Sequence, residues 1–349
     1  MKLKYLGWAL AALGASSAVQ AQQASSVTVY GRVDTGVFHQ SGFGSSMVGE
    51  DHYHTSRLGF TGVEDLGGGL AAIFKMEMRF LPRSGATQDS STFFNDESYV
   101  GLRSTSFGTL KLGRVYSPFY LAVAGRIDPF NGDGIGSMTG LTSLGHNLSP
   151  GNPYYAAKNL PNEDVRTINA VDYTSPTFNG FTGYVQKGFS NTVGKPSGIA
   201  VALRYDSPTF FAQTGYERKP FSLKAYSEHI GGGYVLGPAR FSVGYTKGYY
   251  SDDEYFRGNK ASAALAGVTY TMGSWAFLGA ISRMRMDEPT LLDAAKGTGS
   301  NLTKWAVGAE YYLSKRTKVY MHYAHFSNPV SIIFVGNRQK EMIGIDHAF

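Results

Sequence analysis

Most of this chain alternates between apolar and polar residues with a period of two. The clearest case is the segment 70–80, LAAIFKMEMRF, in which Lys75, Glu77 and Arg79 share one phase and apolar residues fill the whole of the other. A helix would scatter these charges around its surface, whereas a strand places them all on one face. The pattern therefore predicts a strand with one apolar and one wet face.

The same pattern recurs along the chain and predicts about sixteen strands. They cover residues 27–40, 56–64, 70–80, 96–103, 109–115, 165–175, 180–189, 199–207, 211–218, 222–235, 239–249, 261–272, 275–286, 303–313, 317–326 and 340–349. Short turns such as 65–69 and 273–274 alternate with long polar loops such as 41–55 and 287–302. This alternation is typical of an up-and-down transmembrane barrel.

Two physical arguments favour a membrane barrel over a soluble β-sandwich. Strands such as 318–323 carry polar or charged residues on one phase and apolar residues on the other, whereas a soluble β-domain of this size would split its strands between two layers with the apolar faces inside. In lipid every backbone group must be paired, and strands achieve this only in a closed barrel. We expect an all-β, 16-stranded antiparallel transmembrane β-barrel. Aromatic residues near strand ends suit its interfacial girdles: Tyr249, Tyr250, Tyr311, Tyr312, Tyr320, Tyr323 and Phe326.

The first 21 residues are predicted to be a signal peptide. Lys2 and Lys4 precede a mostly apolar run that ends at Val19-Gln20-Ala21, which fits a small-residue cleavage site. Residues 22–349 then form a single barrel domain in the outer membrane. Removing the two lysines lowers the formal net charge from +6 to +4, which is too weak and too scattered to indicate nucleic-acid binding. The chain has no Cys, which excludes disulfides, thiolate metal sites and cysteine nucleophiles.

One connection is unusually long and rich in glycine. Residues 116–164 follow a short strand and include Arg126, Asp128 and Asp133 around Pro129-Phe130-Asn131-Gly132. Loops of this length are usually functional or disordered, and the aromatic residues here need something to pack on. We expect the loop to fold into the barrel and form a constriction.

Several segments resemble the trimeric general porins of Gram-negative outer membranes. They are residues 27–34, VTVYGRVD, residues 56–60, SRLGF, residues 99–102 and 107–114, and the ending 343–349, IGIDHAF, with its terminal Phe. The resemblance implies a homotrimeric channel for passive diffusion of small hydrophilic solutes, without catalysis or cofactor. It also implies contact with outer-membrane lipid and lipopolysaccharide, and recognition of Phe349 by the barrel-assembly machinery.

In such porins acidic residues on the inward loop face basic residues on the opposite wall. The resemblance places Arg32, Arg57, Lys75 and Arg166 on the wall, beside Glu77. It places Asp128 and Asp133 near the acidic positions of the loop, which also contains Arg126. Asp96 stands where an Arg is usual, which weakens the basic wall. Charges on a lipid face are costly, so charges within alternating strands independently indicate a wet lumen.

The charges balance in number, so the expected selectivity depends on their positions. Basic residues on rigid strands should converge, while carboxylates on a glycine-rich loop can turn toward the backbone of the loop or pair with Arg126. We therefore predict a mild preference for anions. The glycines Gly31, Gly59, Gly62 and Gly101 are predicted either to line the subunit contact on the outer wall or to let the barrel bend.

Three alternatives remain open. A substrate-specific channel on the same barrel would use aromatic residues such as Tyr116, Phe119 and Tyr120 as a slide. An outer-membrane enzyme would need a Ser–His pair, and no motif singles one out. A secreted soluble β-protein such as a lectin is the third possibility.

Overall fold

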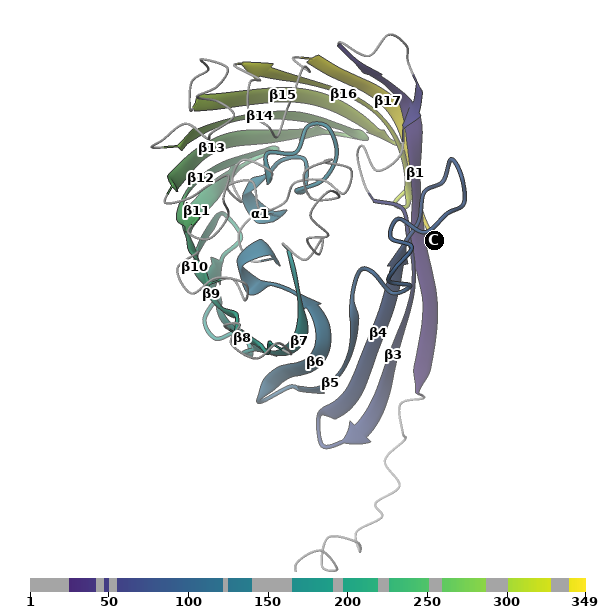
Figure 1. The fold of residues 1–349 in the computed structure, drawn as a ribbon, viewed down its shortest axis with the longest axis vertical. Helices are drawn as coiled ribbons and strands as arrows, with labels where there is room; N and C mark the ends of the chain where they lie inside the picture. Colours follow the sequence, from purple (N-terminus) through teal and green to yellow (C-terminus); the bar gives the residue numbers. More distant parts are fainter. Residues whose placement is uncertain are drawn as a thin grey trace, which may run out of the picture.

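A single antiparallel sheet curves round until its first and last strands meet (Figure 1). The computed structural model describes residues 25–41, 47–49, 55–121, 125–139, 165–190, 197–218, 226–250, 259–286, 301–327 and 339–349. The predicted signal peptide and residues 140–164 of the predicted loop lie outside these ranges.

Within the described ranges the sheet contains seventeen strands, of which the three-residue β2 (Met47–Gly49) pairs with β1 alone. The other sixteen form the ring: β1 (Ser26–Gln40), β3 (Arg57–Gly67), β4 (Leu70–Arg79), β5 (Ser98–Ser104), β6 (Gly108–Tyr116), β7 (Arg166–Thr174), β8 (Phe181–Gly188), β9 (Ile199–Asp206), β10 (Phe210–Arg218), β11 (Tyr226–Leu236), β12 (Ala239–Tyr250), β13 (Asn259–Met272), β14 (Trp275–Met286), β15 (Asn301–Tyr312), β16 (Thr317–Ser327) and β17 (Gln339–Ala348). The predicted 16-stranded antiparallel barrel is confirmed.

The barrel closes where β1 meets both β3 and β17. The first half of β1 pairs with β3, from Ser26↔Val63 to Arg32↔Arg57, and its second half pairs with β17 as far as Gln40↔Lys340. Phe349 completes the seam, because its amide donates to the Gly31 carbonyl at 3.0 Å and its carbonyl accepts from the Gly31 amide at 3.1 Å. No sheet edge is left open at this seam, as a membrane barrel requires.

Short turns join alternate pairs of strands. They span residues 68–69, 105–107, 175–180, 207–209, 237–238, 273–274 and 313–316. In the turn after β3, Gly67, Gly68 and Gly69 have φ angles of 82°, 61° and 77°, a left-handed conformation that glycine adopts without strain. The remaining connections are longer, so the barrel has a turn end and a loop end, as predicted.

The wall is apolar outside and polar inside, the reverse of a soluble protein. On β16, Val319 and Met321 are exposed, while Lys318, Tyr320 and His322 alternate with them and are buried. Three of the predicted girdle residues are therefore wrong. Tyr312 lines the interior cleft, and its hydroxyl donates to the buried Glu310 at 3.0 Å. Tyr320 and Phe326 point inward, and the Tyr320 hydroxyl donates to Asp34 Oδ1 at 2.7 Å. A period-two pattern fixes which residues share a face, but an aromatic residue fits either face.

The glycines predicted for a subunit contact are also not an open outer surface. Gly59 and Gly101 lie opposite Glu77 and Lys111 on the inward phase. Gly31 and Gly62 face outward, but the rings of Phe349 and Phe74 cover them. The expected glycine surface at these four positions is wrong, because two of the glycines face the lumen and aromatic rings cover the other two.

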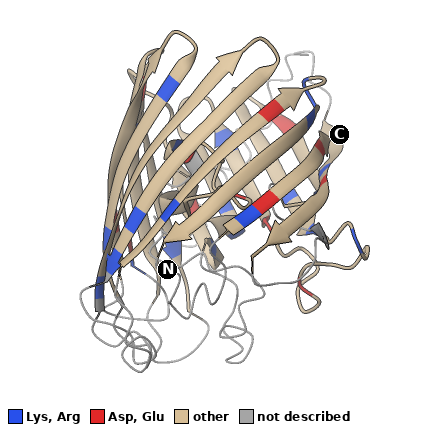
Figure 2. Ribbon diagram, turned by 90° about the horizontal axis from the view of Figure 1, so that it is seen from above, with Lys and Arg blue, Asp and Glu red and all other residues tan. Residues whose placement is uncertain are grey.

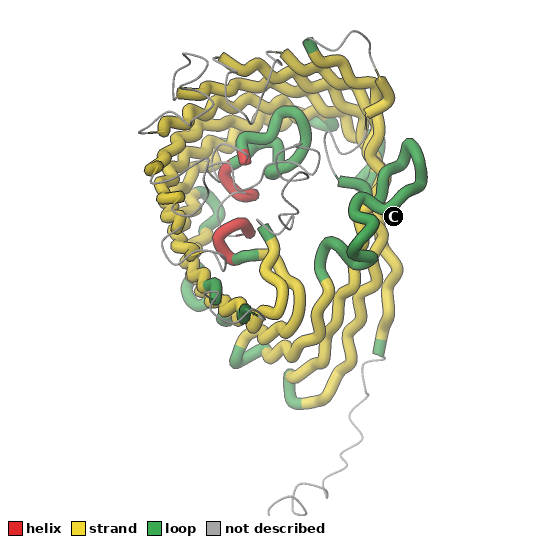
Figure 3. Tube along the Cα trace, viewed as in Figure 1, coloured by secondary structure: helices red, strands yellow, loops and turns green. Residues whose placement is uncertain are grey.

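Residues 117–121 and 125–139 lie inside the ring (Figures 1 and 3). The second segment begins with the short α1 (Gly125–Ile127), which packs on β11, β12 and β13. In the described part of the chain no helix is both long and apolar enough to cross a membrane.

Candidate pore lining

Three arginines stand side by side on the inner wall. Arg32 of β1 is in register with Arg57 of β3, and Arg57 is in register with Arg79 of β4. Like charges directly opposite one another on a sheet are destabilising. This row therefore requires nearby acidic residues to offset the repulsion, and by itself it does not stabilise the fold.

Each arginine has an acidic partner placed behind it. Arg32 contacts Asp346 at 3.2 Å, and Arg57 contacts Glu77 at 3.5 Å. Glu77 also accepts from the Tyr30 hydroxyl at 2.6 Å. Lys75 bridges Glu77 and Glu97, at 3.3 and 2.8 Å, so its charge is shared between two carboxylates.

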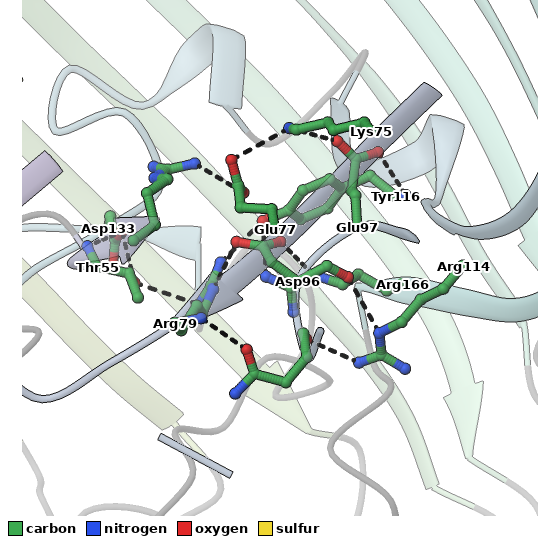
Figure 4. A network of polar contacts seen from close by, with 12 residues as sticks. Thr55, Lys75, Glu77, Arg79, Asp96, Glu97, Arg114, Tyr116, Asp133 and Arg166 are labelled. Atoms are coloured by element: carbon green, nitrogen blue, oxygen red, sulfur yellow. Dashed lines mark hydrogen bonds and ion pairs between the residues drawn. The ribbon is translucent and has the colours of Figure 1, made fainter. Parts of the chain in front are cut away.

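Asp96 lies at the centre of the network (Figure 4). It is fully buried and accepts from Arg79 Nε at 2.8 Å and Arg166 Nε at 2.6 Å. Burial alone would raise the pKa of this carboxyl, but the two guanidinium groups outweigh that effect and hold the pKa of Asp96 well below its usual range. Instead of opposing the basic wall, Asp96 orients two of its arginines.

Tyr116 is the second member of the network that fixes these arginines. Its hydroxyl accepts from Arg79 Nη2 at 2.8 Å and from Arg166 Nη2 at 2.6 Å. The Arg166 guanidinium also lies over the Tyr116 ring, 4.4 Å from its centroid. Arg166 is almost completely buried, so it supports the row and is not part of the open surface.

The charged residues of the loop differ in whether they contact the barrel wall or the loop itself. Asp133 points to the wall, where it accepts from the Thr55 amide at 2.9 Å and the Thr55 hydroxyl at 3.0 Å. Asp128 is buried inside the loop and accepts from the amides of Phe130 and Met138 and from the Ser137 hydroxyl. Arg126 pairs with Asp206 at the end of β9. The Asp128 carboxylate therefore does not face the opposite wall, and the predicted pairing of Arg126 with the loop acids is not observed.

The loop is held by the half of the wall that lies away from the arginines. Ile127, Phe130 and Met138 pack with small or apolar inward residues, which are Phe211, Leu265, Leu278, Ala280, Ala306 and Ala324. Gly267 lies directly under Pro129, and a Cβ there would come within 2.6 Å of the Pro129 ring. Ser242 Oγ donates to the Ile127 carbonyl at 2.5 Å, and Lys304 donates to the Ser137 carbonyl.

A cleft of about 500 Å³ remains between the loop and the arginine row. Its charged lining comprises Arg32, Arg57, Arg79, Lys315, Arg316, Lys318, Asp133 and Asp346. Six bases against two acids leave a formal excess of four positive charges. Of the residues predicted for the constriction, Arg32, Arg57 and Asp133 line this cleft, whereas Lys75, Glu77, Asp96, Arg126, Asp128 and Arg166 do not.

Sequence reasoning missed several members of the site. Arg79 shares its phase with Lys75 and Glu77, so the signal for it was present in the sequence. Arg114 shares its phase with Leu110 and Leu112, but a bulge between Gly113 and Val115 interrupts the alternation. Its guanidinium donates to the carbonyls of Asp96 and Asn95 at 3.0 and 3.2 Å. Lys318 shares its phase with Tyr320 and His322, so a signal for it was also present, whereas the 313–316 turn gave none.

A closed barrel with an apolar exterior and a charged interior defines a membrane channel. Comparison with known proteins gives the same class. The profile of the family described as Gram-negative porin matches residues 9–330. Outer membrane porin protein 32 of Delftia acidovorans is 30% identical over 92% of this chain and 88% of its own length. An outer membrane porin protein of Bordetella pertussis is 26% identical over 97% of this chain and 98% of its own length.

A solved structure, the anion-selective porin from Comamonas acidovorans, superimposes with a TM-score of 0.76 at 24% identity, covering 93% of this chain and 100% of that one. The chain belongs to the Gram-negative porin family. It is a non-enzymatic outer-membrane porin for passive diffusion.

Proposed function

We propose that this porin conducts anions in preference to cations and that the loop segment 125–139 forms the narrow part of its channel. The observation that carries the proposal is the in-register row of Arg32, Arg57 and Arg79 beside the cleft. Positive charges on a narrow low-dielectric wall attract anions and repel cations. The two relatives named above as porins, and the anion-selective porin that shares the fold, are consistent with this assignment.

Two features of the packing support the constriction. The loop rests on the apolar half of the inner wall, so burial of Ile127, Phe130 and Met138 favours the inward position. Asp133 ties the same loop to Thr55 close to the arginine row. The loop therefore spans from one side of the lumen to the other and leaves the opening on the basic side.

The aromatic residues near the cleft do not favour a substrate-specific channel. Tyr116 is held by two arginines and is nearly buried, and Phe119 is buried with its ring edge-on to His229. Tyr120 stacks on Tyr116 at a centroid distance of 5.3 Å. The cleft lining adds the exposed Tyr312, and two exposed rings are too few for an aromatic slide.

Replacement of single arginines tests the proposal. In planar bilayers, Arg57→Ser and Arg79→Ser should each lower the chloride-to-potassium permeability ratio and change the single-channel conductance. Lys187→Ser is the control, because Lys187 has the outward phase of Val185 on β8 and does not line the cleft. Wild-type selectivity and conductance in both variants would refute the assignment of the row.

We also propose that the functional unit is a homotrimer. Support comes from the family and from a fold relative, OmpT of Vibrio cholerae, whose structure is described as a trimer form. Unheated protein should migrate near three times the mass of the heated chain in gel electrophoresis. A strictly monomeric species in mild detergent would contradict the trimer without affecting the selectivity assignment.

A further inference from the structure

A second group of arginines lies inside the barrel, across the ring from the arginine row. Basic residues occur on strands all round the ring (Figure 2). Arg126 is the middle residue of α1, Arg204 lies on β9 and Arg240 lies on β12, whereas the row stands on β1, β3 and β4 (Figure 1). The cleft beside the row is lined by other residues. We call Arg126, Arg204 and Arg240 the turn-side cluster.

The strand positions place the cluster in the lumen near the turn end. Arg204 lies two residues before the end of β9, and Arg240 is the second residue of β12, so both are close to the short turns 207–209 and 237–238. Both have the inward phase, since Ala202 and Ser242, two residues along the same strands, are buried. Ser242 donates to the carbonyl of Ile127, the residue after Arg126, so the loop is fixed at this level of the wall.

Aromatic rings bring the three guanidinium groups close together. Arg240 Cζ lies 4.2 Å and Arg126 Cζ 5.3 Å from the centroid of the buried Phe211 ring. Arg204 Cζ lies 5.9 Å from the centroid of the Tyr184 ring. The Arg240 guanidinium also donates to the Arg126 carbonyl, which connects the wall to the loop. These contacts offset part of the repulsion between the like charges.

A single carboxylate serves the whole cluster. Asp206 accepts from Arg204 Nε at 2.6 Å and pairs with Arg126. Along β8 to β12, as far as these strands are described, the other inward-facing acid is Glu217, which lies six residues along β10 from Phe211 and therefore about 20 Å away. Three bases and one acid leave a formal charge of +2.

The guanidinium groups retain hydrogen-bond donors that the protein does not use. Arg126 Nε has no hydrogen-bond partner among the described residues, so the ion pair with Asp206 does not satisfy this group. Within the described chain Arg204 donates through Nε and Arg240 through one Nη. The side chains of Arg126 and Arg204 are 32% and 28% exposed, so an ion in the lumen can reach them. Guanidinium donors bind the oxygens of oxyanions in pairs.

We propose that the turn-side cluster binds one doubly charged oxyanion, such as sulfate or hydrogen phosphate, and that the bound ion fastens the loop to the wall. The formal charge of +2 matches such an ion, and the unused N–H groups supply its hydrogen bonds. Arg126 belongs to the loop, whereas Arg204 and Arg240 belong to the wall, so an ion held by all three bridges the two. The site is separate from the arginine row and does not depend on the ion selectivity assigned to that row.

The test measures the thermal midpoint of the full-length folded porin in detergent as sodium sulfate is added at millimolar concentrations, against sodium chloride of equal ionic strength. Sulfate should raise the midpoint of the wild type, because a ligand of the folded state shifts the unfolding equilibrium by mass action. The variant Arg204→Gln/Arg240→Gln should bind sulfate at least about tenfold more weakly. Asp206→Asn should bind it more tightly, because the competing carboxylate is gone.

Two further variants separate this site from the rest of the barrel. Lys187→Ser removes an outward-facing base from β8 and should leave the sulfate titration unchanged. Arg57→Ser should lower the anion selectivity of the channel but keep the stabilisation by sulfate. The current noise of the open wild-type channel should also fall when sulfate replaces chloride, because the loop is held more firmly.

Equal sulfate binding by the double variant would overturn the proposal. So would loss of the sulfate effect in Arg57→Ser, which would place the ion at the arginine row and leave the selectivity assignment intact. Equal stabilisation by the singly charged nitrate would show that the site does not require a doubly charged ion, which also overturns the proposal. If the double variant fails to fold, an unchanged or weaker sulfate affinity in Asp206→Asn has the same negative meaning.

Discussion

At the scale of single residues, the three arginines of the inner-wall row face the cleft, and each of them is paired with a carboxylate. Arg57 and Arg79 are directly opposed in the sheet, and their acids Glu77 and Asp96 are both buried. A buried ion pair adds little net stability compared with an apolar pair, but removing one partner is costly. The network is therefore better understood as a device that keeps arginines in position.

Replacing Asp96 with Asn tests this interpretation. The variant leaves Arg79 and Arg166 without their shared carboxylate, so we expect a loss of about 3–5 kcal/mol in stability at neutral pH. The pKa of Asp96 is lowered in the folded state, so its contribution is present above the pKa of the unfolded chain, about 3.9, and disappears as the pH falls through the folded value. The stability difference between wild type and variant should therefore shrink only in strong acid.

Thermal unfolding in detergent from about pH 7 to about pH 3 measures this difference. Asp89→Asn is the control, because Asp89 lies in the same connection and bonds only to nearby Ser91 and Thr92 among its described partners. An Asp96→Asn variant as stable as the wild type at neutral pH would show that the carboxylate does not hold the arginines.

The sequence predicted these residues to different extents. Lys75, Glu77 and Arg79 follow from strict alternation, because nothing interrupts β4. Arg114 could not be placed, because the bulge after Gly113 changes the facing of the residues that follow. Asp128 could not be placed either, because its orientation depends on the amides of Phe130 and Met138, which only the folded loop brings together.

At the scale of elements, the inward loop depends on a surface made for it. Gly244, Gly267 and Gly308 lie under Ile127, Pro129 and Phe130, where a larger side chain would collide with the loop. A pattern along one strand cannot reveal this surface, because it is assembled from small inward residues on several strands. The loop was predictable from its length and composition, but its docking position was not.

Phe130 is the main apolar anchor of the loop. It is fully buried and meets His322 edge-on with a centroid distance of 5.1 Å. Phe130→Ala should cost about 3–5 kcal/mol of stability, as for other buried aromatic truncations. It should also increase the current noise of the open channel, because the loop is less firmly held. Phe93→Ala is the control, since Phe93 is 62% exposed. If the Phe130→Ala variant has the current noise and the stability of the wild type, Phe130 does not anchor the loop.

Phe349 belongs to the element that closes the ring. Its deletion removes two backbone hydrogen bonds to Gly31 together with the ring that covers this glycine, so we expect a lower yield of folded, heat-modifiable protein in the outer membrane. Phe349→Ala keeps both backbone hydrogen bonds but removes the ring, so comparison with the deletion distinguishes the two contributions. Wild-type yields of folded protein for both variants would show that Phe349 has no role in assembly.

At the scale of the whole molecule, the barrel was largely predictable because the membrane imposes one simple rule. Every strand must present apolar residues to lipid and close its hydrogen bonds with neighbours, so the period of two persists around the ring. Most predicted strand boundaries agree with the structure to within two residues. The outer-face glycines were misjudged because Phe349 and Phe74 reach them from neighbouring strands.

The division of the lumen into an apolar half that holds the loop and a basic half that borders the cleft is the central feature of the channel. Its functional consequence is the sign of the ion selectivity. Potassium and chloride have nearly equal mobilities in water, so a reversal potential in a KCl gradient reports the charge of the channel itself.

The most direct test is the reversal potential of the wild-type porin in a bilayer that separates dilute from concentrated KCl. The excess of basic residues predicts a reversal potential whose sign corresponds to a preference for chloride. Its magnitude should decrease when the salt concentration of both solutions is raised toward about 1 M, because the Debye length there falls to about 3 Å. A potential of the opposite sign, or none at low salt, would contradict the assignment of the arginine row to the channel wall.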